Sequence, residues 1–330
     1  MFASKIEEGY TLDQVAITQP PFSFPLFIPT YTQKYRGAAL PLRWVAVDVR
    51  NLLNPRRTRE AILNPHFADE TRSRDYLRVD GNCQLLAVLN GQDWMLESFW
   101  AMQRPATLQQ LRASGFEVGT GATYSVMGLT TEGTAVPYAH HTAMLMRHHR
   151  VLDEMQRAGI AAIPNLYWLD GDRRELARWS DWLRSNSAIS TVSRDFTSTS
   201  QWSVISPKVD ELVLLLRNAG RQFHILIVGT GRANAPRILH KLVMAGHTAT
   251  IVTSAPIMKA LSGVKYDIDS SGVSSEGSSN RLTFPFPLLI EHNLAVFENI
   301  LFHVIAGTSA AQQAVRNFTP RVGVSTGQVE

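Results

Sequence analysis

The sequence predicts an α/β protein built as a single (β/α)8 barrel of the TIM type. Short apolar runs alternate with helical stretches along most of the 330 residues, and this alternation is typical of parallel sheets. About seven or eight such units follow one another, which favours a barrel over an open doubly wound sheet. The clearest unit spans residues 223–256, where an apolar run, a glycine turn, a helical stretch and a second apolar run occur in order.

The expected strands are short apolar runs bounded by turn residues. They span residues 43–49, 84–89, 116–118, 160–168, 189–192, 223–228 and 250–252, with 282–289 as either an eighth strand or an arm. The expected helices span residues 94–102, 108–113, 140–158, 172–185, 209–218, 236–245 and 294–306. Residues 270–280 are rich in Ser and Gly, which predicts a mobile loop.

The chain divides into three expected segments. Residues 1–40 are rich in Pro and aromatic residues, and proline this dense prevents a regular helix. We therefore expect residues 1–40 to form an extended arm lying over the barrel. Residues 41–310 would form the barrel, and residues 311–330 a C-terminal tail.

Composition excludes several kinds of site. Cys83 is the only cysteine, so a disulfide framework and zinc or iron–sulfur sites with several cysteines are excluded. The pairs His140-His141 and His148-His149 share one expected helix but lack the spacing of a helical zinc site. We expect neither a metal nor a cofactor. Residues 1–10 lack the apolar segment of a signal peptide, and no run is long enough to span a membrane, so we expect a soluble cytoplasmic protein.

Positive charge is concentrated in arginine clusters. The formal net charge is +4, and arginines gather in residues 50–59, 72–78 and 173–178. The arginine fork binds two phosphate oxygens at once, so several clusters together predict a nucleic-acid partner. The alternative is a solvated face with scattered ion pairs.

In a barrel, the active site lies at the carboxyl ends of the strands. Asp48, Asp93 and Asp195 lie at three such ends and are the candidate catalytic carboxylates, because a carboxylate acts as a general base or as a nucleophile at a sugar carbon. We favour Asp93 as the group that activates water. An Asp after a strand is also a common helix N-cap, and that alternative stays open for Asp93 and Asp195.

Polar and aromatic residues at the same ends suit a planar polar ligand such as a nucleobase. Aromatic rings stack on a base, and amides, hydroxyls and guanidinium groups bond its edges. Tyr167 and Trp168 are adjacent, so in a strand they face opposite ways and one of them is expected in the core. The candidate substrate-binding residues are Glu97, Thr120, Tyr124, Asn165, Tyr167, Trp168, Arg194 and Ser254.

A glycine turn offers a phosphate site. Peptide N–H groups at a turn that opens a helix point at whatever lies there, and the helix dipole favours an anion. The expected phosphate-binding residues are Gly229, Thr230, Gly231 and Arg232. The alternative is that the glycines only allow a strand to bend tightly into a helix.

Three segments carry a resemblance to known proteins: GFEVGTGATYSV (115–126), AGIAAIPNLYW (158–168) and FHILIVGTG (223–231). In this order they resemble a family of mostly uncharacterised phage and bacterial proteins, over about residues 84–260. In such a family, Asp93 and Glu97 occupy expected positions of polar site residues. More distantly, ILIVGTG followed by a helix and a strand is similar to the late barrel strands of the tRNA-guanine transglycosylases and their DNA-modifying branch.

Two departures from the transglycosylases matter. Those enzymes hold a structural zinc through several cysteines and a histidine, and this chain has one cysteine. They also carry a nucleophilic Asp on a late strand, where this chain has Thr253-Ser254. The resemblance thus implies a nucleobase-handling barrel, and the missing Asp favours hydrolysis over base exchange. The related biology would be anti-phage defence by excision of modified bases from phage DNA.

The leading hypothesis is a metal-independent DNA glycosylase that removes a modified base and leaves an abasic site. Gly229–Arg232 would hold a backbone phosphate, residues 50–78 would grip the duplex, and Tyr167 or Trp168 would stack on the extruded base. The alternatives are a transglycosylase inserting a deazaguanine base into DNA or tRNA, a non-catalytic nucleic-acid-binding barrel, and an enzyme acting on a phosphorylated metabolite.

Overall fold

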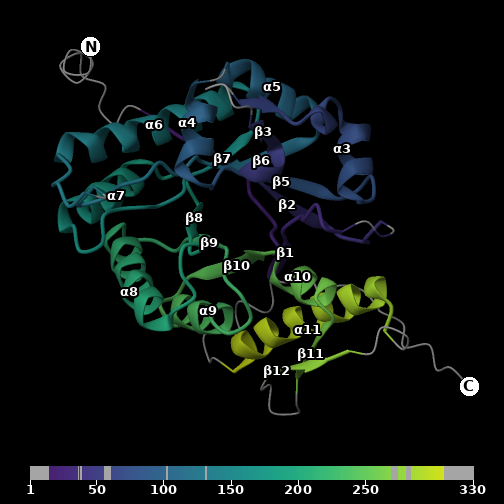
Figure 1. Ribbon diagram of the computed structural model, residues 1–330. Coiled ribbons are helices and arrows are strands. Elements are labelled where there is room, and N and C mark those ends of the chain that lie inside the picture. The colour runs from purple at the N-terminus through teal and green to yellow at the C-terminus, as the bar shows by residue number, and fades with distance from the viewer. Residues whose placement is uncertain are drawn as a thin grey trace, which may run out of the picture.

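The computed structural model describes residues 15–35, 37, 39–55, 61–101, 103–130, 132–268, 274–279 and 284–307. Within them the protein is a mixed α/β structure whose large sheets are parallel (Figure 1). The first sheet has the order β2 (Trp44–Asp48), β5 (Gln84–Val88), β6 (Phe116–Thr120), β7 (Ala161–Ile163). The second has the order β1 (Phe27–Pro29), β10 (Thr248–Thr253), β9 (His224–Val228), β8 (Thr191–Asp195).

Two isolated parallel bridges connect these sheets, one at each side. Thr30, just after β1, bridges Ala46 of β2, and the Tyr31 N–H donates to the Ala46 carbonyl at 2.8 Å. On the other side Asn165, just after β7, bridges Ser193 of β8. Each outer strand of one sheet therefore adjoins an outer strand of the other.

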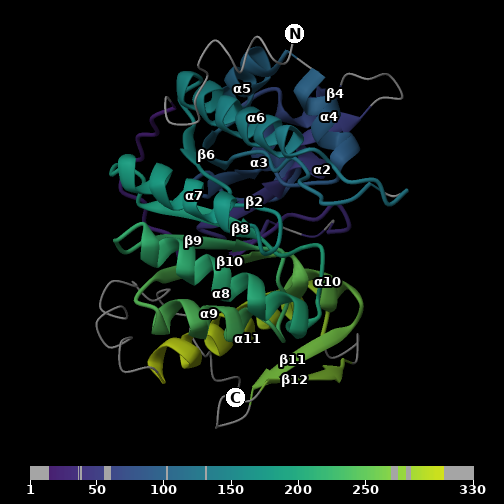
Figure 2. The ribbon, with the colours of Figure 1, turned by 90° about the vertical axis from the view of Figure 1, so that its left-hand side faces the viewer.

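Helices cover the outer faces of both sheets. Figures 1 and 2 show α4, α5 and α6 beside the first sheet and α8, α9 and α11 beside the second. The helices are α2 (Val49–Leu52), α3 (Glu70–Leu77), α4 (Asp93–Ala101), α5 (Arg104–Ala113), α6 (Tyr138–Arg157), α7 (Arg173–Ser185), α8 (Trp202–Asn218), α9 (Ala235–Met244), α10 (Ala255–Leu261) and α11 (Phe286–Ala306), with the 3-10 turn η2 (Pro65–Phe67). Two antiparallel hairpins complete the fold: β3 (Leu53–Pro55) with β4 (Ala61–Leu63), and β11 (Val264–Ile268) with β12 (Ser274–Ser278).

Alternate residues of each strand enter two different apolar clusters. On β5, Leu85 and Ala87 pack under the helices, whereas Leu86 and Val88 belong to a second cluster between the sheets. This follows from the alternation of side chains along a strand. We call the second group the central cluster; it consists of Phe24, Ile28, Trp44, Ala46, Leu86, Val88, Val118, Ile163, Leu226, Val228 and Val252.

Most of the expected elements are confirmed within a few residues, and several differ. The expected helix at 294–306 begins at Phe286. The expected strand at 160–168 ends at Ile163, because Pro164 has no N–H to continue a ladder. The expected strand at 189–192 lies later, at Thr191–Asp195, and the expected helix at 209–218 begins earlier, at Trp202. The expected loop at 270–280 contains the strand β12.

The last strand was placed wrongly at 282–289. Helix α11 begins at Phe286, and the missing strand is β1, in the proline-rich segment expected to be an arm. Residues 27–29 pair with β10 in the sheet rather than lying over it. The expected tail at 311–330 lies outside the described residues.

Helix α11 is long and apolar enough to cross a membrane by length and composition alone. Half of it is buried, and it packs against α9, α10 and β11. The core helix of a soluble protein passes the same test. Helix α11 is the one such helix within the described part of the chain.

Candidate functional site

A layer of polar residues closes the central cluster at the carboxyl ends of the strands. On β1, Ile28 is followed two residues later by Thr30, and on β5, Val88 is followed two residues later by Asn90. Because side chains alternate along a strand, each later residue lies on the same side of the sheet as the residue two positions before it. The same step on every strand of the two large sheets gives what we call the polar layer: Thr30, Asp48, Asn90, Thr120, Asn165, Asp195, Thr230 and Ser254.

Two neighbouring clefts open at this end. The larger has a volume of about 820 Å³, and its lining includes Asp48, Asn90 and Ser254 together with the glycine turn. The smaller has a volume of about 310 Å³, and its lining includes Asn165 and Asp195. Both are lined by Gly91, Thr197 and Ser198, so the two clefts are contiguous.

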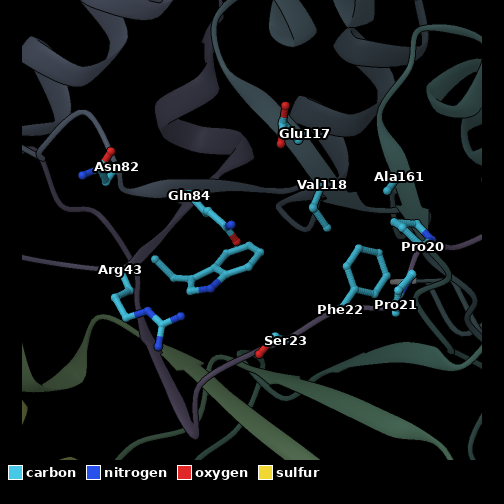
Figure 3. Close-up of a pocket in the computed structure, with 11 residues that line it drawn as sticks. Pro20, Pro21, Phe22, Ser23, Arg43, Asn82, Gln84, Glu117, Val118 and Ala161 are labelled. Atoms are coloured by element: carbon cyan, nitrogen blue, oxygen red, sulfur yellow. The ribbon is translucent and has the colours of Figure 1, made fainter. Parts of the chain in front are cut away.

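A third cavity lies at the opposite ends of the strands (Figure 3). It has a volume of about 360 Å³, with Phe22 and Pro21 at one side and Arg43 and Asn82 at the other. Phe22 packs on the central cluster and closes it at this end. None of the expected site residues lines this cavity.

Asn90 is the centre of a buried hydrogen-bond network. Its Oδ1 accepts from Thr120 Oγ1 at 3.5 Å, from Thr123 Oγ1 at 3.2 Å and from Asn165 Nδ2 at 2.9 Å. Asn165 Oδ1 has no hydrogen-bond partner among the described residues. Asn90 Nδ2 approaches the Asp195 carboxylate, but within the described structure it has no partner at hydrogen-bond geometry. The pair therefore contains one buried donor and one buried acceptor without partners among the described residues.

Asp195 ends β8 and is partly buried. Its Oδ1 accepts from the Thr197 N–H at 2.7 Å. Burial raises the pKa of Asp195 above its usual value, and the hydrogen bonds from Thr197 oppose that rise. The carboxylate is thus held in a fixed direction without capping a helix.

Asp48 ends β2 and lines the larger cleft. Its Oδ1 accepts both from Asn51 N at 3.0 Å and from Asn51 Nδ2 at 2.8 Å, so Asp48 caps the short helix α2. Burial raises the pKa of Asp48, against the hydrogen bonds from Asn51. Asp48 combines a structural role with a position in the cleft.

Asp93, the favoured carboxylate, lies at the margin of the site. It is the first residue of α4, it is exposed, and the Ser125 hydroxyl donates to its Oδ1. It lines the smaller cleft. Glu97, one helical turn further, lines neither cleft and pairs with Arg147 at 2.6 Å.

Tyr167 and Trp168, the residues expected to stack on a base, form hydrogen bonds to the surrounding helices. The Tyr167 hydroxyl donates to the Met144 carbonyl of α6 at 2.9 Å. Trp168 Nε1 donates to Glu211 of α8 at 2.6 Å, and the Arg194 guanidinium lies 4.0 Å from the centre of the Trp168 ring. Both aromatic residues, rather than one, are therefore core residues, and both also line the smaller cleft.

Arg194 and Tyr124 belong to the same packing layer. Arg194 Nη1 donates to the Leu166 carbonyl at 2.7 Å, and burial lowers the pKa of Arg194 to about 10. The ring of Tyr124 packs edge-on against Trp100 of α4 at 5.8 Å and lies 5.6 Å from the Arg147 guanidinium. Both residues contribute to the wall of the smaller cleft.

The glycine turn differs from the expected anion cradle. Gly229 has φ +80°, and a Cβ there would lie 2.0 Å from Thr197 Cγ2, so the position requires glycine. Its N–H already donates to the Val252 carbonyl at 2.9 Å. Helix α9 starts only at Ala235, whose N–H donates to the Gly231 carbonyl at 2.9 Å. The Gly229 amide is therefore not available to the expected phosphate.

The side chains of Thr230 and Arg232, in the same turn, differ in their hydrogen bonding. Thr230 Oγ1 is buried and has no hydrogen-bond partner among the residues that the structure describes. Arg232 is engaged: its Nη1 donates to Ser274 Oγ at 2.6 Å, and its Nε lies 3.3 Å from Glu276 Oε1.

His148, on α6, positions the network from outside. Its Nδ1 lies 2.6 Å from the Ala122 carbonyl and its Nε2 lies 3.3 Å from the Asn165 N–H. Nδ1 therefore donates and Nε2 accepts, so the ring is neutral. Burial lowers the pKa of His148 to about 3. The described residues include no group of three or more His, Cys, Asp or Glu side chains that could hold a metal ion.

Two of the described arginines in residues 50–78, Arg50 and Arg74, lie far from each other. Arg50 is exposed at the larger cleft, whereas Arg74 donates to the Cys83 carbonyl at 2.6 Å, immediately before the start of β5. Arg74 therefore lies at the amino ends of the strands, opposite the clefts. Arg56, Arg57 and Arg59 lie outside the described residues.

Comparison with known proteins adds no relative: no protein-family model matches the chain, and no curated protein is significantly similar to it. The function is therefore argued from the polar layer and the two clefts.

Proposed function

We propose that the protein is a DNA glycosylase that hydrolyses the N-glycosidic bond of a modified base and leaves an abasic site. The scaffold we propose is a (β/α)8 barrel. The two bridges that join the sheets at both sides, and the run of parallel strands in chain order, support a closed barrel. In such a barrel the carboxyl ends of the strands form the active site, which is where the polar layer and clefts lie.

The observation that carries the proposal is a partly buried, non-capping carboxylate beside an unsatisfied amide pair. Asp195 is the carboxylate, and Asn90 and Asn165 form the pair. In hydrolysis, water adds to C1′ of the sugar while the bond from C1′ to the base nitrogen breaks. A carboxylate accepts the proton of the attacking water, and the departing base takes up a proton. A raised pKa places the Asp195 carboxylate nearer the range where it exchanges protons effectively.

The other two carboxylates rank below Asp195. Asp48 Oδ1 is already used twice to cap α2, so fewer of its lone pairs face the cleft. Asp93 is exposed to water, and water weakens its electrostatic effect on a reacting sugar. Both remain candidates that substitution by Asn distinguishes.

The amide pair suits the edge of a nucleobase. A free donor beside a free acceptor matches an edge with one acceptor and one donor, such as the N–H and carbonyl of a lactam. An unpaired buried polar group costs about 1–3 kcal/mol, so a ligand that pairs with both amides recovers that free energy. This gives binding energy that depends on the chemistry of the base.

The test is incubation of the purified protein with DNAs that carry ordinary or modified bases. Released bases are identified by mass spectrometry, and abasic sites by alkaline cleavage. We expect one class of modified base to be released and Asp195→Asn to lower release about 100-fold or more. Ser203→Ala, on the first turn of α8 and absent from both cleft linings, is the matched control and should leave release unchanged. Intact DNA with every base tested would refute the proposal.

Base exchange is the second candidate, and Asp195 itself favours it. A carboxylate at the end of a strand can attack C1′ and hold the sugar covalently until a second base arrives. Incorporation of a labelled free deazaguanine into DNA or tRNA would identify this reaction. If the Asp195, Asp48 and Asp93 variants all keep wild-type nucleic-acid binding and no reaction is found, the protein is a binding module.

A further inference from the structure

Glu276 bridges two cations at the rim of the larger cleft. Its Oε2 lies 2.8 Å from Lys259 Nζ, and its Oε1 lies 3.3 Å from Arg232 Nε. Lys259 is on α10 and lines the cleft, and Arg232 directly follows Gly231, which also lines it. Two cations and one carboxylate leave a net charge of about +1 at the rim.

The carboxylate comes from the hairpin β11–β12, outside the two large sheets. Glu276 is on β12, opposite Tyr266 of β11, and Figures 1 and 2 show the hairpin beside α10 and α11. The Glu276 side chain is 31% exposed, so water reaches it. Hydrogen bonds from Lys259 and Arg232 lower the pKa of Glu276 and keep it ionised at neutral pH.

We propose that Arg232 and Lys259 form a phosphate subsite, and that the Glu276 carboxylate occupies it until a phosphate group displaces it. Carboxylate and phosphate oxygens accept the same hydrogen bonds from guanidinium and ammonium groups. Thr230, in the same turn as Arg232, carries a buried hydroxyl without a hydrogen-bond partner among the described residues. The inference rests on the proposed function only in taking that phosphate to belong to DNA.

The contacts of Glu276 with Arg232 and Lys259 therefore set a minimum affinity that a phosphate-containing ligand needs in order to bind. A free phosphate group has to compete with Glu276 for both cations, whereas a DNA strand held also at the amide pair competes at high local concentration. A ligand that lacks the second attachment is selected against. Removing the negative charge of Glu276 should therefore tighten phosphate binding.

The test compares Glu276→Gln with Asp267→Asn. Both remove one negative charge from the same hairpin, but Asp267 pairs with Lys265 and not with Arg232 or Lys259. Dissociation constants are measured at low salt for inorganic phosphate and for a ten-residue single-stranded oligothymidylate. We expect Glu276→Gln to tighten binding of both about fivefold to tenfold, Asp267→Asn to change it less than about twofold, and Lys259→Met to weaken it.

The two probes separate the sources of phosphate. Tighter binding of both probes indicates a general phosphate subsite, and tighter binding of the oligonucleotide alone indicates a site for the nucleic-acid backbone. Equal effects of the two hairpin variants, or weaker binding by Glu276→Gln, would overturn the inference. Because binding is measured without base release, failure of the glycosylase proposal leaves this test intact. Base release with no effect of Glu276→Gln would refute the subsite alone.

Discussion

Two buried histidines on α6 predict that the fold loses stability steeply as the pH falls from 6.5 to 5. His148 and His149 are almost fully buried, and burial lowers the pKa of His148 to about 3 and that of His149 to about 4. In the unfolded chain both titrate near pH 6.5. Protonation therefore favours the unfolded state, so the stability present above pH 6.5 is lost as the pH falls towards the folded pKa values.

The size of the loss follows from these pKa values. At pH 5 an unfolded histidine is almost fully protonated while a folded one with a pKa of 3 or 4 is not, which corresponds to about 2 kcal/mol for each residue. Together they give about 4 kcal/mol, a large part of the 5–15 kcal/mol of a typical domain. Asp48 and Asp195 act in the opposite direction, because a raised carboxyl pKa stabilises the fold as the pH falls.

His149→Phe isolates one of the two contributions. The ring of His149 stacks on Trp179 at 5.2 Å, and its Nε2 has no hydrogen-bond partner in the described part of the chain, so a phenyl ring fits the same place. The variant loses the contact between Nδ1 and the Leu145 carbonyl, worth about 1 kcal/mol. Urea unfolding at pH 7.5 and 5 should show the variant losing about 2 kcal/mol less than the wild type over this interval. An equal loss in both proteins would show that His149 is not the titrating group.

Three further variants test the site. Asp195→Asn should lower base release about 100-fold or more. The same variant should raise the free energy of unfolding at pH 7, because the raised pKa of Asp195 makes its ionised form unfavourable in the fold; urea unfolding at pH 7 and 3.5 should show this gain disappearing at the lower pH. Gly229→Ala should destabilise the fold by more than about 2 kcal/mol in the same assay, since a Cβ would meet Thr197 at a positive φ; an unchanged midpoint would contradict the described turn. Asn90→Leu should weaken binding of a free nucleobase about tenfold or more by calorimetry, and equal affinities would remove Asn90 from recognition.

The sequence alone predicted much of the polar layer where a strand has a clear apolar run. Asp48 and Asn165 could be predicted because the residues two positions earlier, Ala46 and Ile163, lie in such runs. Thr30 was missed because closely spaced prolines concealed β1. Asn90 is absent from the candidate site residues, although the two-residue step from Val88 identifies it.

Other side chains could not be placed because their positions depend on tertiary structure. Tyr167 and Trp168 lie beyond the short strand β7, so alternation could not assign their faces. Arg50 and Arg74 are close in sequence, yet the path through α2 and α3 carries them to opposite ends of the strands. Glu276 lies in a Ser/Gly-rich stretch with no apolar pattern, and only the pairing of β12 with β11 brings it to Arg232.

The unequal ends of the central cluster give a physical reason to place function at the carboxyl ends of the strands. At the amino ends, Phe22, Phe24 and Trp44 close the cluster with aromatic packing, which stabilises the fold by burial of apolar surface. At the carboxyl ends, Asn90 Nδ2, Asn165 Oδ1 and Thr230 Oγ1 are buried without partners among the described residues. At about 1–3 kcal/mol each, these atoms oppose folding, and aliphatic side chains there would avoid that cost. A ligand with complementary hydrogen-bonding groups would pair with these atoms and remove this cost. The polar layer would then stabilise the ligand-bound protein while it destabilises the ligand-free protein.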